Sequence, residues 1–224
     1  MGYHFDFGGI VAYLPAFRSG IWITLQLTFY SCVFGTVLGL PVAALLTFPH
    51  PAVRAVLVLA VDTIRAVPDL VLFFFFFYFP YREVFGIEPL RPFISAVLAM
   101  TTILTMYCGD LFREAARQAP RSQALGLRGI GFSSLQVFRY ATLPAVVRHA
   151  LPSLVAFWIG ILKMSSLASA IGVNDTVFVA KIGMAQSYRS LEAWITVALV
   201  YVVLVLPPVY GMRILQGRPW MQRQ

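Results

Sequence analysis

Five charged side chains lie inside stretches of sequence that are otherwise apolar, and they are the residues best placed to do chemistry. They are Asp62, Arg65, Asp69, Asp110 and Lys163. An ionised group at the centre of a bilayer costs about 2.5–3.5 kcal/mol on insertion scales, so it is expected to face a protein interior or a wet cavity. Such groups either contact a ligand or pair with one another.

Asp62, Arg65 and Asp69 follow the spacing i, i+3 and i+7, which predicts one helical face with ion-pair spacing on both sides of the arginine. Pro68 breaks the backbone hydrogen-bond ladder nearby. Broken helices at membrane depth often line a substrate path. Two interpretations remain for the Asp62–Arg65 pair: an internal ion pair that orients helices, or direct contact with a ligand. For Lys163, snorkelling toward an interface competes with a place in the path.

Catalytic and metal-binding patterns are not found in the sequence. It has no Walker-type phosphate loop, no His/Cys/Asp cluster with metal spacing and no serine with a plausible base. We therefore expect no catalytic residue, no metal and no cofactor. Cys32 and Cys108 lie in apolar stretches and are predicted to be packing residues.

The composition predicts an all-α integral membrane protein. Hydrophobic residues make up 59% of the 224 residues, charged residues 12%, and the mean hydropathy is +0.80. A soluble domain has about a quarter charged residues. The net charge of +8 resides mainly in arginines at the edges of the apolar stretches, which argues against a nucleic-acid partner.

Five apolar stretches are each long enough to cross a bilayer, which takes about 20 residues. We predict spans at 19–49, 55–80, 92–109 continuing toward 112, 149–171 and 193–212. Five spans place the termini on opposite sides. The whole chain, 1–224, is predicted to be a single transmembrane domain.

The arginines predict the orientation of these spans. One set of loops carries ten basic residues against one acid, Glu114, and the other set carries five basic residues against five acids. Because cytoplasmic loops are enriched in Lys and Arg, the N-terminus is predicted outside and the C-terminus in the cytoplasm. The ten are Arg54, Arg113, Arg117, Arg121, Arg128, Arg139, Arg148, Arg213, Arg218 and Arg223.

Residues 113–152 are too long and too patterned to be a bare connector. Ser133 and Gln136 form a predicted capping box that opens a short helix. Pro120 is predicted to open another helix, and Pro144 to close the second. This pair of short helices in the cytoplasm has the geometry of a docking element.

Other features of the apolar stretches are interpreted as packing. Gly35 and Gly39 form a Gly-x-x-x-Gly pair that allows a close helix approach, with an interface to a second subunit as the alternative. Trp22, Trp158 and Trp194 are predicted to be interfacial or packing aromatics and not a ligand cage.

Several short patterns, in order, resemble the inner-membrane permease subunits of ABC importers for polar amino acids, the histidine/glutamine type. The stretch DTIRAVPDL is similar to the family's acid-x-x-Arg-x-x-Pro pattern, and Tyr107-x-x-Asp110-x-x-Arg113 to its Tyr-x-x-Glu-x-x-Arg. Leu143-Pro144, Arg148 and Leu151-Pro152 resemble the end of its cytoplasmic coupling loop. LPAFRSGIWITLQLT and LKMSSLASAIG also look like family stretches, so the resemblance covers about residues 13–212.

The resemblance implies a type I ABC importer permease fold of five transmembrane helices in the bacterial inner membrane. The chain itself would hydrolyse nothing. Its partners would be two ATP-binding cassette subunits, a second permease subunit (identical or related), and an extracytoplasmic binding protein that delivers a polar amino acid. The implied substrate path comprises Asp62, Arg65, Asp69, Tyr107, Asp110 and Lys163.

The resemblance places ATPase docking on a loop at about 117–143, and the chain departs there from the family pattern. Gly131, twelve residues before Leu143, matches the family's loop glycine, so the Glu-Ala-Ala positions hold Leu125, Gly126 and Leu127. The location and length of the loop are kept, but its acidic residue is replaced by Leu125. The implied docking residues are Arg121, Leu125, Gly126, Gly131, Ser133, Leu143 and Pro144. The alternatives are an ATP-independent small channel and a membrane-bound enzyme.

Overall fold

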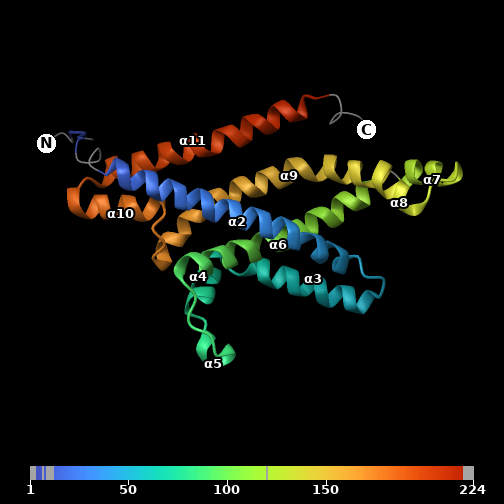
Figure 1. Cartoon of the computed structure of the whole chain (residues 1–224), viewed down its shortest axis with the longest axis horizontal. Coiled ribbons are helices and arrows are strands. Elements are labelled where there is room, and N and C mark those ends of the chain that lie inside the picture. The colour runs from blue at the N-terminus through green and yellow to red at the C-terminus, as the bar shows by residue number, and fades with distance from the viewer. Residues whose placement is uncertain (1–3, 7, 9–12, 120, 219–224) are drawn as a thin grey trace. The chain divides into compact units, whose positions relative to one another are not determined.

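All regular elements that the computed structural model describes, over residues 4–6, 8, 13–119 and 121–218, are helices (Figure 1). Four helical segments are long and apolar enough to cross a membrane. They are Leu14–Leu46, Pro92–Gln118, Ser134–Ile171 and Ser190–Gln216. The prediction of an all-α, multi-pass chain agrees with this architecture.

The second predicted span is divided into two helices. Helix α3 covers Pro51–Ala66 and α4 covers Asp69–Tyr78. Pro68 occupies the N-cap position of α4 with extended backbone angles, φ −56° and ψ 134°, and a proline cannot donate the amide hydrogen bond that would continue the first helix. The predicted break is confirmed, but Asp69 thereby starts a new helix. The continuous helical face predicted for Asp62, Arg65 and Asp69 is therefore wrong.

The described chain forms two compact units. The first unit contains α2 (Leu14–Leu46) as far as Val33, the segment Val67–Thr102 and the segment Trp158–Pro208. The second unit contains Phe34–Ala66, Ile103–Phe157 and the end of the last helix from Val209. Helices α2, α6 (Pro92–Gln118), α9 (Leu143–Met164) and α11 (Ser190–Gln216) contribute to both.

The core of the first unit joins α2, α10 (Thr176–Ser187) and α11 (Figure 1). Between α9 and α10, the 3₁₀ helix η2 covers Ser165–Ile171 and ends at Gly172 in the left-handed conformation, φ 84°. Short helix α5 (Tyr81–Phe85) also belongs to this unit. The buried core residues are Phe17, Val177, Val179, Ala180, Ala193 and Val197.

The second unit is built on a close approach of α2 and α6. A Cβ atom added to Gly35 would lie 2.7 Å from the Leu104 side chain, and one added to Gly39 would lie 2.4 Å from that of Cys108. From the opposite helix, a Cβ on Gly109 would lie 2.4 Å from Val42. The glycine pair therefore serves packing within this chain. Cys108 is a buried free cysteine, as predicted for a packing residue.

The segment from Ser134 to Met164 forms one nearly continuous helical path of three parts. Helix α8 (Ser134–Val137) passes into the π-helix η1 (Phe138–Thr142) and then into α9. The prediction that Pro144 closes a helix is wrong, because Pro144 lies in the first turn of α9. A proline can occupy a first turn since its missing N–H has no required partner there. Helix α7 covers Arg121–Gly129, while Pro120 lies outside the described residues.

Candidate functional site

The predicted intramembrane charges of the second unit form a compact cluster between α3 and α6. The Arg65 guanidinium hydrogen-bonds the Asp110 carboxylate across the two helices. Arg113 Nη2 lies 2.8 Å from the other oxygen of Asp110. One carboxylate thus holds two arginines, and charge-assisted contacts of this kind are stronger than neutral hydrogen bonds.

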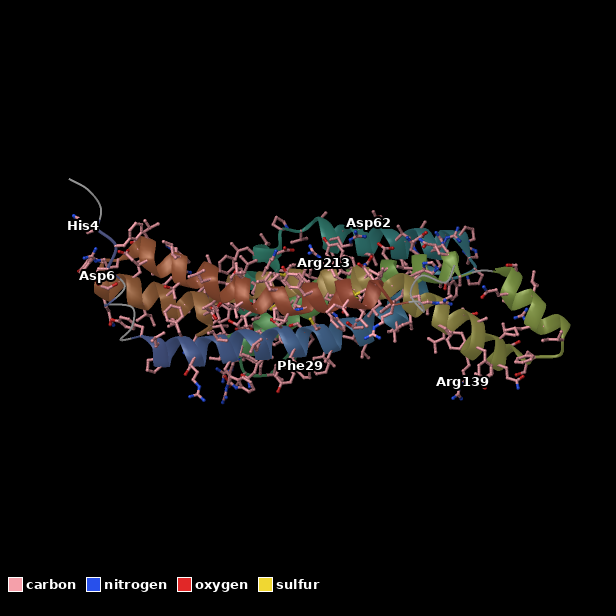
Figure 2. The ribbon with its side chains drawn as sticks, turned by 90° about the horizontal axis from the view of Figure 1, so that it is seen from above. His4, Asp6, Phe29, Asp62, Arg139 and Arg213 are labelled. Carbon is pink, nitrogen blue, oxygen red and sulfur yellow. The ribbon has the colours of Figure 1, made fainter. Side chains whose placement is uncertain are left out.

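Asp62, the partner predicted for Arg65, is in contact at a longer distance. Arg65 Nη1 lies 3.8 Å from Asp62 Oδ1, and the Asp62 side chain is 60% exposed against 26% for Asp110. Figure 2 labels Asp62 on α3. The principal partner of Arg65 is therefore Asp110 on the neighbouring helix α6, and not Asp62 on its own helix.

Tyr107 completes this cluster. The Arg65 guanidinium carbon lies 4.7 Å from the Tyr107 ring centroid, within cation–π range. The ring also packs against Phe157, with 5.4 Å between centroids. Asp62, Arg65, Tyr107 and Asp110, four of the six predicted path residues, therefore lie together in the second unit. With Arg113 they carry two positive and two negative charges, so the cluster is electrically balanced.

The remaining two predicted path residues lie in the first unit. Asp69 is the first residue of α4, where a carboxylate interacts favourably with the helix dipole. Lys163 lies exposed in the last turn of α9. Neither belongs to the charge cluster just described.

The predicted capping box is confirmed in the α7–α8 hairpin. The Ser133 amide donates to Gln136 Oε1 at 2.8 Å, and the Gln136 amide donates to Ser133 Oγ at 3.4 Å. Gly131 has φ 92°, a left-handed conformation that favours glycine. Its amide donates to Arg128 O at 3.0 Å, which ends α7.

The hairpin leaves large apolar side chains uncovered by the described chain. Leu125 is 66% exposed, Ile130 73% and Leu135 76%. Phe138 and Tyr140 of the adjoining π-helix are also exposed, and Figure 2 labels the neighbouring Arg139. Arg121 begins α7, Gly126 lies inside it, and Leu143 and Pro144 begin α9. Exposed apolar side chains set among arginines are typical of a protein contact surface.

A buried polar network in the first unit was missed from the sequence. The hydroxyls of Thr24 on α2 and Thr176 on α10 lie 2.9 Å apart, and the Thr176 amide donates to Thr24 Oγ1 at 3.3 Å. Asp175 caps α10 by accepting from the Phe178 amide at 2.9 Å. Gly20 allows α2 to lie close to the backbone of Asp175, since an added Cβ would lie 2.9 Å from Asp175 O. The available signal was an N-cap aspartate three residues before Phe178.

Asp175, which follows the third long apolar segment in the sequence and precedes the fourth, is fully buried. Its Oδ2 has no hydrogen-bond partner among the described residues. Burial raises the pKa of this carboxyl to about 6, although the amides of Phe178 and Val177 and the charge of Lys181 lower it. Lys181 donates to Ser169 Oγ at 3.0 Å. In the charge count from the sequence, Asp175 is one of the five acids in the loops predicted to face outside.

Residues 4–6 contact the start of α11. The Asp6 amide donates to Glu192 Oε1 at 3.1 Å, and Arg189 donates to His4 O at 3.0 Å (Figure 2). Arg189 also lies 3.7 Å from both the Asp6 and Glu192 carboxylates. Glu192 is fully buried. No group of His, Cys, Asp and Glu that could hold a metal ion occurs among the described residues.

Comparison with known proteins shows similarity over nearly the whole chain. Residues 35–220 match the family described as binding-protein-dependent transport system inner membrane component. The probable amino-acid ABC transporter permease protein PatM of Vibrio harveyi is 30% identical, over 90% of this chain and 92% of its own. The glutamine transport system permease protein GlnP of Escherichia coli is 28% identical, over 96% and 97%.

A solved structure described as an amino acid ABC transporter with histidines has a similar fold. It superposes with a TM-score of 0.83 at 27% identity, covering 96% of this chain and 99% of the other.

Proposed function

Because this chain belongs to the family of binding-protein-dependent transport system inner membrane components, we propose that it forms the transmembrane path for a polar amino acid. It is the permease subunit of an amino-acid ABC importer. The observation that carries the substrate class is the similarity to amino-acid permeases along nearly the entire length.

The proposed topology has five crossings with the N-terminus outside. The four long apolar helices each cross once, and α3 with α4 makes the remaining crossing as a broken pair. The arginine-rich hairpin and C-terminus then face the cytoplasm, which agrees with the ten-to-one excess of basic residues in those loops. The protein belongs to the bacterial inner membrane in this proposal.

The α7–α8 hairpin is proposed to dock an ATP-binding cassette subunit. Its support is the combination of exposed Leu125, Ile130 and Leu135 with a rigid frame, made by the capping box and the left-handed glycine. Leu125 occupies the position at which the family has an acidic residue, so in this proposal an apolar contact with the ATPase replaces a charged one. Two such ATPases, a second permease subunit (identical or related) and an extracytoplasmic binding protein complete the assembly.

Energy coupling follows from that arrangement. ATP binding closes the two ATPases, and each docked hairpin carries the motion directly into α9, because α8, η1 and α9 adjoin without a loop. The spans then alternate between outward and inward access. The chain itself hydrolyses no ATP; its residues bind, orient and release the solute.

The solute path is proposed to include the Asp62–Arg65–Tyr107–Asp110 cluster, with Asp69 and Lys163. Within the cluster, Arg65 forms a salt bridge with Asp110, and Asp110 forms a second one with Arg113. These contacts support a scaffold role for the Arg65–Asp110 pair. Asp62 is the more exposed carboxylate. It is therefore our candidate for contact with the ammonium group of an amino acid.

Gly131→Glu tests this function in proteoliposomes that contain the complete transporter. A bulky charged residue at the left-handed position should abolish ATP-dependent amino-acid uptake and co-purification of the ATPase, while membrane assembly persists. Gly86→Glu is the matched control, since Gly86 also has positive φ, 69°, and open space around its Cβ position. It should keep the ATPase bound.

Two outcomes would contradict the proposal. Normal uptake and ATPase retention by Gly131→Glu would remove the docking role of the hairpin. Solute flux through the chain alone, without nucleotide, would identify a channel, and solute conversion without nucleotide would identify an enzyme.

A further inference from the structure

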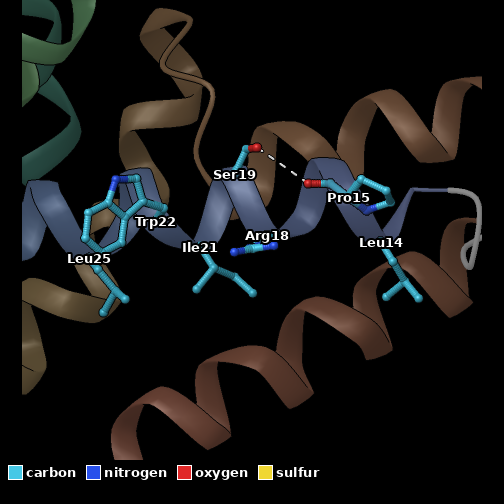
Figure 3. Close-up of a pocket in the computed structure, with 7 residues that line it drawn as sticks. All are labelled: Leu14, Pro15, Arg18, Ser19, Ile21, Trp22 and Leu25. Carbon is cyan, nitrogen blue, oxygen red and sulfur yellow. Dashed lines mark hydrogen bonds between the residues drawn. The ribbon is translucent and has the colours of Figure 1, made fainter.

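The first turns of α2 carry a groove of about 960 Å³ on the first unit. Its lining residues all come from α2 and are mainly apolar (Figure 3). Four of them, Leu14, Arg18, Ile21 and Leu25, have the spacing i, i+4, i+7 and i+11 of one helical face, and the other three adjoin it. The full set of lining residues is Leu14, Pro15, Arg18, Ser19, Ile21, Trp22 and Leu25.

Arg18 is the charged residue of this groove, and it makes no salt bridge with another described residue. Two other arginines of the first unit are paired: Arg82 lies 3.4 Å from Glu88, and Arg189 lies 3.7 Å from both Asp6 and Glu192. Arg91, like Arg18, makes no salt bridge with another described residue, but it does not line the groove. Figure 3 shows Arg18 between Leu14 and Ile21. A guanidinium bordered by apolar side chains favours an anion that brings its own apolar part.

The order of side chains along α2 matches the order of groups in a phospholipid. The uncharged run of the first span begins at Ser19, immediately after Arg18. Trp22 follows one turn later and is 62% exposed, as interfacial tryptophans are. Ile21 and Leu25 continue the apolar face toward the middle of the helix. The cation is thus at headgroup depth and the apolar residues at acyl-chain depth.

From this order and charge, we propose that the Arg18 groove binds an anionic phospholipid. The guanidinium receives the phosphate in a bidentate contact, and one acyl chain lies along Ile21, Trp22 and Leu25. A zwitterionic lipid fits less well because its own ammonium group compensates the phosphate. The binding does not depend on the transported solute.

Quenching of Trp22 fluorescence by brominated lipids tests the proposal. The other three tryptophans of the chain are first changed to Phe, and the transporter is placed in phosphatidylcholine bilayers. They are Trp158, Trp194 and Trp220, the last of which lies outside the described residues. Acyl-brominated phosphatidylglycerol should quench Trp22 at about one-fifth of the mole fraction needed with brominated phosphatidylcholine. Arg18→Gln should make the two lipids equal, whereas Arg82→Gln, which breaks a paired arginine, should preserve the preference.

Three results would overturn the proposal. Equal quenching by both lipids in the parent would show ordinary bilayer contact, and a preference that survives Arg18→Gln would place the anion elsewhere. Absence of quenching by either lipid would show that protein, such as a second permease subunit, covers the groove. Native mass spectrometry of the unmodified transporter gives an independent reading, with one fewer phosphatidylglycerol retained per chain expected for Arg18→Gln.

Discussion

The two units place their polar groups in opposite ways. In the second unit, the partly exposed Asp110 carboxylate forms salt bridges with both Arg65 and Arg113. In the first unit, Asp175 is completely buried, accepts a hydrogen bond from the Phe178 amide and makes no salt bridge with another described residue. Burial explains the difference, because an ionised carboxylate needs either water or a counter-ion.

This contrast assigns different physical roles to two carboxylates. Asp110 acts as an anion that holds two cations, Arg65 on α3 and Arg113 one turn away on α6. Asp175 acts as a hydrogen-bond acceptor at the start of α10, and its negative charge is unfavourable there. Removing the charge should therefore be harmful at Asp110 and favourable at Asp175.

The largest effect is expected from Asp110→Asn. It leaves Arg65 and Arg113 without their shared carboxylate, so we expect a loss of about 2–4 kcal/mol, between the values for exposed and buried pairs. Asp62→Asn is the matched control and should lose about 0–1 kcal/mol, because Asp62 is largely exposed. Thermal unfolding in mild detergent measures both variants. Equal losses would contradict the ranking of the two aspartates.

The double variant Arg65→Gln with Asp110→Asn separates scaffold from transport. It removes one charge of each sign and keeps hydrogen-bonding groups, so it should recover part of the lost stability. Recovered uptake would identify the pair as structural. Recovered assembly with absent uptake would show that one of the two contacts the solute.

The second prediction concerns Asp175 and pH. Its folded-state pKa of about 6 lies above the ordinary value of 3.8, so its contribution to stability is present at low pH and is lost as pH rises through 6. Between about pH 7.5 and pH 5, wild type should gain on the order of 1 kcal/mol from this group. Asp175→Asn keeps a cap and should lack that gain. An identical pH dependence of unfolding in the two proteins would refute the assignment.

Sequence patterns predicted those parts of the structure that depend on neighbours along the chain. The break at Pro68 and the Ser133 capping box are local, and both are present. The apolar stretches likewise predicted the four long helices.

Partners that depend on tertiary packing could not be predicted in the same way. Spacing favoured Asp62 as the partner of Arg65, but the position of α6 brings Asp110 closer. The buried network of Thr24 with Thr176 joins residues 152 positions apart, and no local pattern encodes such a contact. Pro144 was misread because a proline suits both the end of one helix and the first turn of the next.

The third prediction tests the close approach of α2 and α6 in the second unit. Gly39→Ala would place a methyl group 2.4 Å from Cys108 Cβ, so we expect a loss of about 1–3 kcal/mol from overpacking. Cys108→Gly in the same chain should relieve the clash. The control is Gly160→Ala in α9, where an added Cβ meets no atom within 4 Å. A tolerated Gly39→Ala would show that this contact is looser than the structure has it.

The smallest expected effect is at the α8 cap in the second unit. Ser133→Ala removes the acceptor for the Gln136 amide and should weaken α8 by about 1 kcal/mol, as N-cap losses do. This cap is exposed, unlike that of Asp175, so water can replace the lost acceptor and global unfolding should change little. Hydrogen exchange at the Gln136 amide should become about fivefold faster. Two control variants should not show this increase, because Ser133→Asp keeps an acceptor and Ser134→Ala leaves the cap intact. Unchanged exchange in Ser133→Ala would mean that the capping box does not hold the start of α8.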